Sequence, residues 1–158
     1  MAKIIGINAK NTTSETSVYD PTGGSGSLIL KVADEAEKLI SLFAQENDTA
    51  TAGLARMNMI LHNNPTAVIK QGNTLSNPLF LDSNGRLKTF DFVVANPPFS
   101  FKSWSNGVNI PEEQQEGGRF YGFGVPPAKN GDYAFLLHIV KSMKSKGKAA
   151  VILPHGVL

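Results

Sequence analysis

Residues 18–26 read Val-Tyr-Asp-Pro-Thr-Gly-Gly-Ser-Gly, and this stretch decides the fold. A short apolar run ends at Asp20 and passes directly into a glycine cluster. Beyond it, apolar residues recur at helical spacing from Leu28 to Phe43, which predicts a helix over that range. The sequence therefore predicts a strand, a glycine turn and a helix in direct succession.

The rest of the chain continues this alternation of strands and helices. Periodicity predicts helices over 49–62, with Leu54, Met57, Ile60 and Leu61 on one side, and 132–145, and strands over 67–70, 90–95 and 148–153. Strands that alternate with helices form βαβ crossovers and a parallel sheet. The predicted fold class is therefore α/β, a doubly wound, Rossmann-like and mostly parallel sheet with flanking helices.

The chain length of 158 residues suits a single domain over 1–158. Residues 1–17 predict a short leading helix and a polar linker. Residues 100–130 are rich in glycine, proline and polar side chains and show no periodicity. We expect them to form a functional or mobile loop.

Composition excludes several classes of protein. The sequence has no cysteine, which rules out disulfide scaffolds, thiolate zinc sites and cysteine nucleophiles, including those that methylate cytosine at a ring carbon. The three histidines are dispersed, so no metal site is expected. A net charge of +2 provides no dense basic stripe, so any grip on DNA would be local or supplied by partners. No stretch is long and apolar enough for a membrane span or a signal peptide, which predicts a cytoplasmic protein.

The strongest chemical motif is Asn96-Pro97-Pro98-Phe99, directly after the predicted strand 90–95. An amide oxygen of Asn96 and the carbonyl of Pro97 could accept both hydrogens of an amino group and free its nitrogen lone pair for methylation. The two prolines stiffen the loop, and Phe99 offers a flat face on which a flipped base can stack. The alternative is a rigid turn that only ends a strand.

The glycine turn is the second motif. Its glycines let the backbone approach a ligand, and the helix that follows can receive a carboxylate at its amino end. S-adenosylmethionine has a carboxylate beside an ammonium group, so we expect this turn to bind that cofactor. The residues assigned to it are Asp20, Thr22, Gly24, Ser25 and Gly26. A plain tight turn is the competing interpretation.

Two further cofactor contacts are predicted at strand ends. Glu46 is placed to accept hydrogen bonds from ribose hydroxyls, and Asn73 to contact the adenine ring. A solvated helix-capping acid and ordinary turn chemistry are the respective alternatives.

Together these motifs resemble the modification, or methyltransferase, subunits of type I restriction–modification systems. The resemblance runs in order through 20–26, 55–62, 72–75, 96–99, 131–135 and 153–158. It implies an adenine-specific DNA methyltransferase that uses S-adenosylmethionine, with DNA, a specificity subunit and a restriction subunit as partners. Many family members have Asp where this chain has Asn73, and we expect its amide oxygen to accept from the adenine instead.

The resemblance also implies a catalytic-core fragment, because the family has further segments before Met1 and after Leu158. We therefore expect the fold to be kept, the cofactor to bind weakly and little methylation by this chain alone. Two alternatives remain open. One is an amino-group methyltransferase for protein glutamine or RNA, and the other is a non-catalytic assembly module that binds the specificity subunit.

Overall fold

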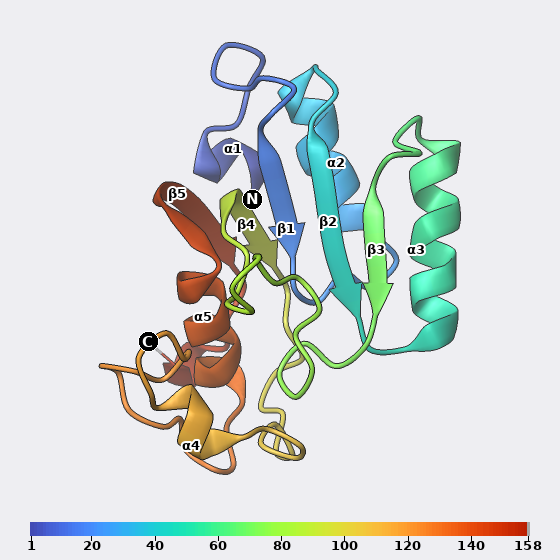
Figure 1. The fold of residues 1–158 in the computed structure, drawn as a ribbon. Coiled ribbons are helices and arrows are strands. Elements are labelled where there is room, and N and C mark those ends of the chain that lie inside the picture. The colour runs from blue at the N-terminus through green and yellow to red at the C-terminus, as the bar shows by residue number, and fades with distance from the viewer. Residues whose placement is uncertain (158) are drawn as a thin grey trace.

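The computed structural model describes residues 1–157 and contains a five-stranded sheet in the order β3-β2-β1-β4-β5 (Figure 1). All four strand pairs of this sheet are parallel. The predicted α/β fold class is therefore confirmed. The elements in chain order are α1 (Ala2–Ile5), β1 (Ser17–Asp20), α2 (Ser27–Ala36), β2 (Ser41–Glu46), α3 (Thr49–Leu61), β3 (Val68–Gln71), β4 (Phe90–Ala95), α4 (Ile110–Glu113), α5 (Asp132–Lys141), β5 (Met143–Val151) and the 3-10 helix η1 (His155–Val157).

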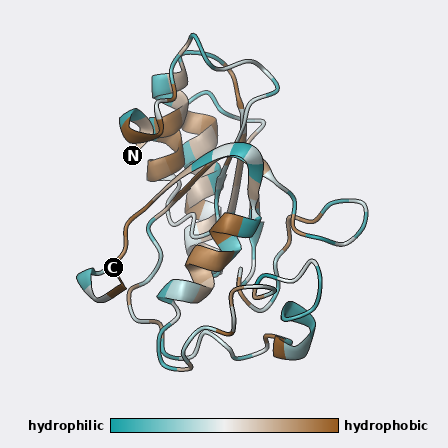
Figure 2. Ribbon diagram, turned by 90° about the vertical axis from the view of Figure 1, so that its left-hand side faces the viewer, coloured by the Kyte–Doolittle hydropathy of each residue, from teal (hydrophilic) through white to brown (hydrophobic). Residues whose placement is uncertain are grey.

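Successive strand residues point to opposite faces of the sheet, and both faces are covered. On one face, Val18 and Leu42 pack in the core formed with α1, α2 and α3. On the other, Tyr19 and Phe90 pack with Ile139 of α5. Figure 2 shows the hydrophobic segments mainly in the helices and strands, and the hydrophilic ones mainly in the connecting loops.

The helix predicted over 28–43 is wrong in its second half. Helix α2 ends at Ala36 because Glu37 takes a left-handed conformation, with φ of 54°. The chain then forms β2, in which Leu42 belongs to one core and Phe43 packs against the other. Apolar residues on both faces of a buried strand produced a spacing that also fits a helix.

The boundary between α5 and β5 also differs from the prediction. The helix ends at Lys141 rather than at residue 145, and β5 begins at Met143. Its pairing with β4 is irregular, since Met143 lies opposite Phe90 whereas Lys148 lies opposite Phe92. Within this bulge, Lys144 forms an ion pair of 2.8 Å with Asp91.

Helix α3 was predicted correctly, but its larger apolar side is not its packed side. Small residues, Ala52 and Ala55, are buried together with Met59. The exposed fractions of the larger residues are 47% for Leu54, 57% for Met57, 64% for Ile60 and 70% for Leu61.

Segment 100–130 contains α4 and contributes to a third hydrophobic cluster. Trp104 is 1% exposed and packs edge-on against Phe120, with ring centroids 5.7 Å apart. Its indole N–H donates to the carbonyl of Pro127 at 2.9 Å. Whether the segment moves as expected stays a prediction. Within residues 1–157, no helix has the length and apolar character needed to cross a membrane.

Candidate functional site

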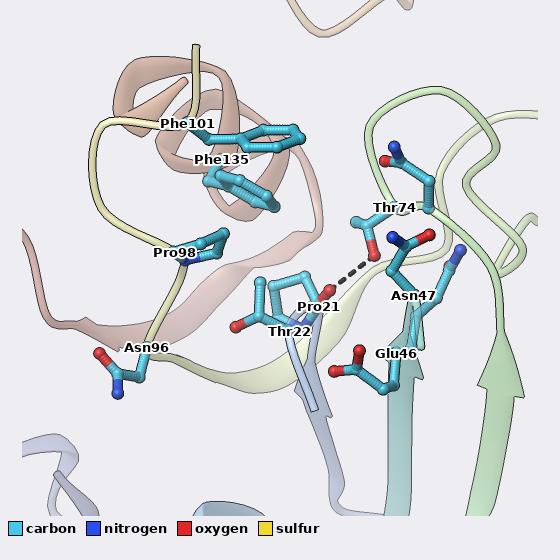
Figure 3. A pocket seen from close by; sticks show the side chains of 11 residues that line it. Pro21, Thr22, Glu46, Asn47, Thr74, Asn96, Pro98, Phe101 and Phe135 are labelled. Atoms are coloured by element: carbon cyan, nitrogen blue, oxygen red, sulfur yellow. Dashed lines mark hydrogen bonds between the residues drawn. The ribbon is translucent and has the colours of Figure 1, made fainter. Parts of the chain in front are cut away.

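A cavity of about 370 Å³ lies at the sheet edge where β1, β2 and β4 end. Doubly wound folds bind ligands at this edge, beyond the carboxyl ends of the parallel strands. Figure 3 shows that the lining side chains come from several strand ends and from α5. The residues that line the cavity are Pro21, Thr22, Gln45, Glu46, Asn47, Asn73, Thr74, Asn96, Pro98, Phe101 and Phe135.

Asp20 lies beneath the turn that follows β1 and is outside the lining of the cavity. It is 1% exposed, and its Oδ1 accepts the backbone N–H of Thr22 at 2.8 Å and the hydroxyl of Thr22 at 3.2 Å. Burial raises the pKa of Asp20 to about 7, because a charged carboxylate is poorly solvated there. Asp20 therefore holds the turn in place through its hydrogen bonds, and Thr22 is a residue of this turn that lines the cavity.

Glu46 lines the cavity and also connects β2 to the glycine turn. Its Oε2 accepts the N–H of Gly24 at 2.9 Å, and its Oε1 accepts the N–H of Asp48 at 2.8 Å. Each carboxylate oxygen can accept more than one hydrogen bond, so acceptor capacity remains for a ligand. The position predicted for a ribose contact is thus on the cavity wall.

Gly24, Ser25 and Gly26 lie outside the cavity lining. At Gly26, packing against α3 explains why the residue is a glycine. Its φ is 81°, and a Cβ there would lie 2.4 Å from Cε of Met59. The Ser25 carbonyl accepts the side-chain amide of Asn58 at 2.9 Å. These residues therefore set the close approach of the turn and α2 to α3.

Asn73 lines the cavity at the turn that follows β3, but its amide oxygen is already used. This oxygen accepts the N–H of Leu75 at 2.9 Å and the N–H of Ser76 at 3.3 Å. The amide nitrogen is therefore the group that remains for a ligand, contrary to the expectation that the oxygen would serve. The neighbouring Thr74 hydroxyl donates to the carbonyl of Pro21 at 2.6 Å, which joins this turn to the turn after β1 (Figure 3).

The Asn96–Phe99 loop is only partly in the cavity. Asn96 and Pro98 line it, whereas Pro97 is buried and Phe99 is 54% exposed outside the lining. Figure 3 shows the Asn96 amide at the rim, turned away from Thr22 and Glu46. The side chain is exposed and has no hydrogen-bond partner among residues 1–157 in this conformation.

Sequence reasoning missed the aromatic wall and a buried amide. Phe101 and Phe135 line the cavity opposite its polar side (Figure 3). Gln45 is 0% exposed, donates to the carbonyls of Gly72 and Asn77, and accepts the N–H of Leu79. A glutamine inside an apolar strand was the signal that could have revealed it.

The cavity combines two kinds of wall. Glu46, Asn73 and Thr74 provide hydrogen-bonding groups on one side. Pro98, Phe101 and Phe135 provide flat or apolar surface on the other. This arrangement suits a ligand that has a planar ring and several hydroxyl or amino groups.

Comparisons with known proteins agree with this architecture. A family model described as N-6 DNA Methylase matches residues 1–158. The type I restriction enzyme MpnII methylase subunit of Mycoplasma pneumoniae is 35% identical, over 98% of this chain and 29% of that protein. The HindI methylase subunit of Haemophilus influenzae is 30% identical, over 88% of this chain and 30% of that protein.

A solved structure is similar along the whole chain. It is the type I restriction–modification system methyltransferase subunit from Streptococcus thermophilus, with a TM-score of 0.85 and 34% identity. The match covers 100% of this chain and 33% of that one. The chain thus spans about a quarter to a third of the length of these relatives. Because the family model is matched along the entire sequence, the chain belongs to the N-6 DNA methylase family.

Proposed function

We propose that this chain carries the cofactor and target-amine pocket of an adenine-specific DNA methyltransferase from a type I restriction–modification system. The observation that carries the proposal is the single cavity that Thr22, Glu46, Asn73 and Asn96 line together. Family membership and the names of the relatives, which are type I methylase subunits, support it.

The cavity fits S-adenosylmethionine, which supplies an electrophilic methyl group on its sulfonium when bound. We assign the ribose hydroxyls to Glu46, whose oxygens keep acceptor capacity, and an adenine nitrogen to the amide nitrogen of Asn73. The amino-acid end is assigned to the turn after β1. Its contacts would come from Asp20, Thr22, Gly24, Ser25 and Gly26.

The target amine is assigned to the Asn96–Phe99 loop. Asn96 Oδ1 and the Pro97 carbonyl would accept the two amino hydrogens, so that the nitrogen lone pair points at the methyl group. Pro98 keeps the loop stiff, and Phe99 stacks on the base. This role requires the Asn96 side chain to turn inward when a base enters. Transfer would form the N–CH3 bond as the S–CH3 bond of the cofactor breaks, with S-adenosylhomocysteine as the leaving group and one amino proton released to solvent. It would need no covalent enzyme intermediate, and the protein's residues would contribute positioning and desolvation.

The finer points of the assignment concern the whole protein. We propose that DNA, a specificity subunit and a restriction subunit are its partners and that it works inside the cell. The recognised DNA sequence would then be set by the specificity subunit. This chain would supply only the chemical step.

The proposal is tested by cofactor binding and methyl transfer with the 158-residue chain. We expect calorimetry to detect weak binding of S-adenosylmethionine, and we expect slow transfer of a labelled methyl group to adenine in duplex DNA. Asn96→Ala should reduce transfer far more than cofactor affinity, because Asn96 is assigned to the target amine. Asn106→Ala, at an exposed position of segment 100–130 that lies outside the cavity lining, is the matched control.

The same assay separates the alternatives. RNA and a glutamine-containing peptide are offered in parallel with DNA, since a planar amine in either could use the same loop. Transfer to RNA or peptide in preference to DNA would replace the proposed substrate. A chain that binds no cofactor would instead support an assembly module. Equal losses of affinity and turnover in Asn96→Ala would contradict the role given to Asn96.

A further inference from the structure

Arg119 is a buried charged side chain that the proposed reaction does not use. It comes from segment 100–130, is 2% exposed and forms an ion pair with Glu113 of α4. Its own backbone N–H donates to Glu113 Oε2 at 2.8 Å. Burial alone would raise the pKa of Glu113, but hydrogen bonds from Arg119 and its positive charge outweigh that effect and lower it.

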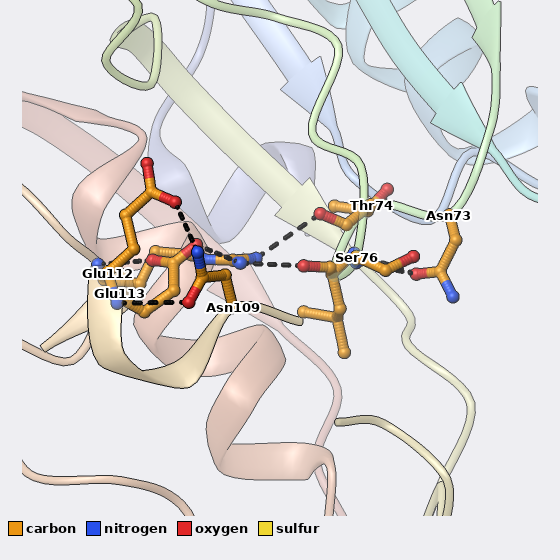
Figure 4. A network of polar contacts seen from close by, with 8 residues as sticks. Asn73, Thr74, Ser76, Asn109, Glu112 and Glu113 are labelled. Atoms are coloured by element: carbon orange, nitrogen blue, oxygen red, sulfur yellow. Dashed lines mark hydrogen bonds and ion pairs between the residues drawn. The ribbon is translucent and has the colours of Figure 1, made fainter. Parts of the chain in front are cut away.

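The same guanidinium also binds the turn after β3. Figure 4 shows Glu113 of α4 and Thr74 of that turn on opposite sides of this network of polar contacts. Arg119 Nη2 donates to the carbonyl of Leu75 at 2.7 Å, and its Nη1 donates to the carbonyl of Thr74 at 3.4 Å. Both bonds are buried, where a carbonyl left without a partner would be destabilising. Arg119 thus joins α4 to a turn that is distant in sequence.

That turn is part of the cavity wall. Asn73 and Thr74 line the cavity, and Asn73 Oδ1 binds the N–H groups of Leu75 and Ser76 from inside the turn. Arg119 binds the carbonyls from the opposite direction. The Thr74 hydroxyl donates to the carbonyl of Pro21, which joins this turn to the turn after β1.

We propose that Arg119 is a positioning residue for the cofactor, which fixes the turn 73–76 so that Asn73 faces the adenine ring. The inference rests on the proposed function and adds that contacts from segment 100–130 influence cofactor binding. Any partner or substitution that displaces α4 would then weaken cofactor binding without touching a cofactor contact.

Two observations support a positioning role over a purely structural one. The planar guanidinium of Arg119 binds two carbonyls and a carboxylate in fixed directions, whereas a lysine ammonium is a point donor on a flexible stem and does not fix their relative placement. Moreover, Nε of Arg119 is buried without a partner among residues 1–157. A buried charge with an unpaired donor is a poor choice for stability alone.

The experiment compares the 158-residue chain with Arg119→Met, Arg119→Lys and Glu113→Gln. Arg86→Met is the matched control, because exposed Arg86 and Arg119 both line a second cavity, which lies between residues 76–87 and 107–119 and shares no lining residue with the first. Amide hydrogen exchange is measured at Leu75 and Ser76, with Gly24 as an internal reference. Binding of S-adenosylhomocysteine is measured by calorimetry. Arg119→Lys and Glu113→Gln keep the test decisive if Arg119→Met fails to fold.

In the Arg119 and Glu113 variants we expect faster amide exchange at Leu75 and Ser76 and unchanged exchange at Gly24. Their cofactor affinity should be lower by about tenfold, the equivalent of roughly one hydrogen bond. Arg86→Met should match the wild type in both measurements. Unchanged exchange in the Arg119 variants overturns the inference, as does faster exchange with wild-type affinity. A wild-type chain that binds no S-adenosylhomocysteine overturns the proposed function instead, while the exchange data still decide whether Arg119 holds the turn.

Discussion

Replacing Asp20 with Asn should stabilise the cofactor-free protein at neutral pH. Asp20 is 1% exposed, and burial raises its pKa from an ordinary value of 3.8 to about 7. Its Oδ1 accepts two hydrogen bonds from Thr22, and an asparagine oxygen can accept the same two. The substitution therefore removes the cost of a buried charge and retains the turn.

The sign of the pH dependence follows from the raised pKa. Between 3.8 and about 7, the unfolded chain has an ionised Asp20, while the folded chain keeps it protonated. The protonated Asp20 therefore contributes its full stabilisation below the pKa of the unfolded state, and this contribution is lost as the pH rises through the pKa of the folded state. The difference between a pKa of 3.8 and one of about 7 corresponds to about 4 kcal/mol of stability as an upper bound, since each factor of ten in a protonation equilibrium is about 1.4 kcal/mol.

The assay is urea unfolding of the wild type and Asp20→Asn over a series of pH values. The variant's advantage in free energy of unfolding should grow from about pH 4 and level off above about pH 7. Asp34→Asn, at an exposed position on α2, is the matched control. Parallel curves for the wild type and Asp20→Asn would refute the reasoning about Asp20.

The remaining predictions concern packing and a second buried titratable group. Burial lowers the pKa of His138 to about 3, so the wild type should lose stability as the pH falls below about 6.5. His138→Gln should reduce this loss in acid unfolding experiments. The same loss of stability with falling pH in both proteins would contradict the prediction. Trp104, the sequence's single tryptophan, should emit at short wavelength and resist acrylamide quenching, whereas emission like that of free tryptophan would show that its segment is not packed. Gly26→Ala should lower the free energy of unfolding by about 1 kcal/mol or more, because the φ of Gly26 is 81°. Urea denaturation would compare this variant with Gly53→Ala. A methyl group at Gly53 meets open space, so that control should be neutral or stabilising.

Opposite effects on stability and binding would connect the first prediction to the proposed function. In the free protein, Asp20→Asn should raise the free energy of unfolding. If Asp20 serves the ammonium group of the cofactor, the same variant should weaken cofactor binding. Stability and affinity that rise together would argue against that contact.

The sequence by itself determined the α/β class and the edge of the sheet that carries the site. The glycine turn after 18–20 and the proline loop after 90–95 end two strands, and parallel strands place such ends side by side. Pattern reasoning therefore found Thr22, Glu46, Asn73 and Asn96, all of which line one cavity.

Only the tertiary structure decided what depends on contacts between distant segments. Periodicity could not separate α2 from β2, because a strand buried on both faces shows apolar residues at helical spacing. Nor could it show that Phe101 and Phe135 form the aromatic wall, or that Arg119 binds the turn at Thr74. These contacts join residues more than thirty positions apart, and local sequence pattern describes only neighbours along the chain.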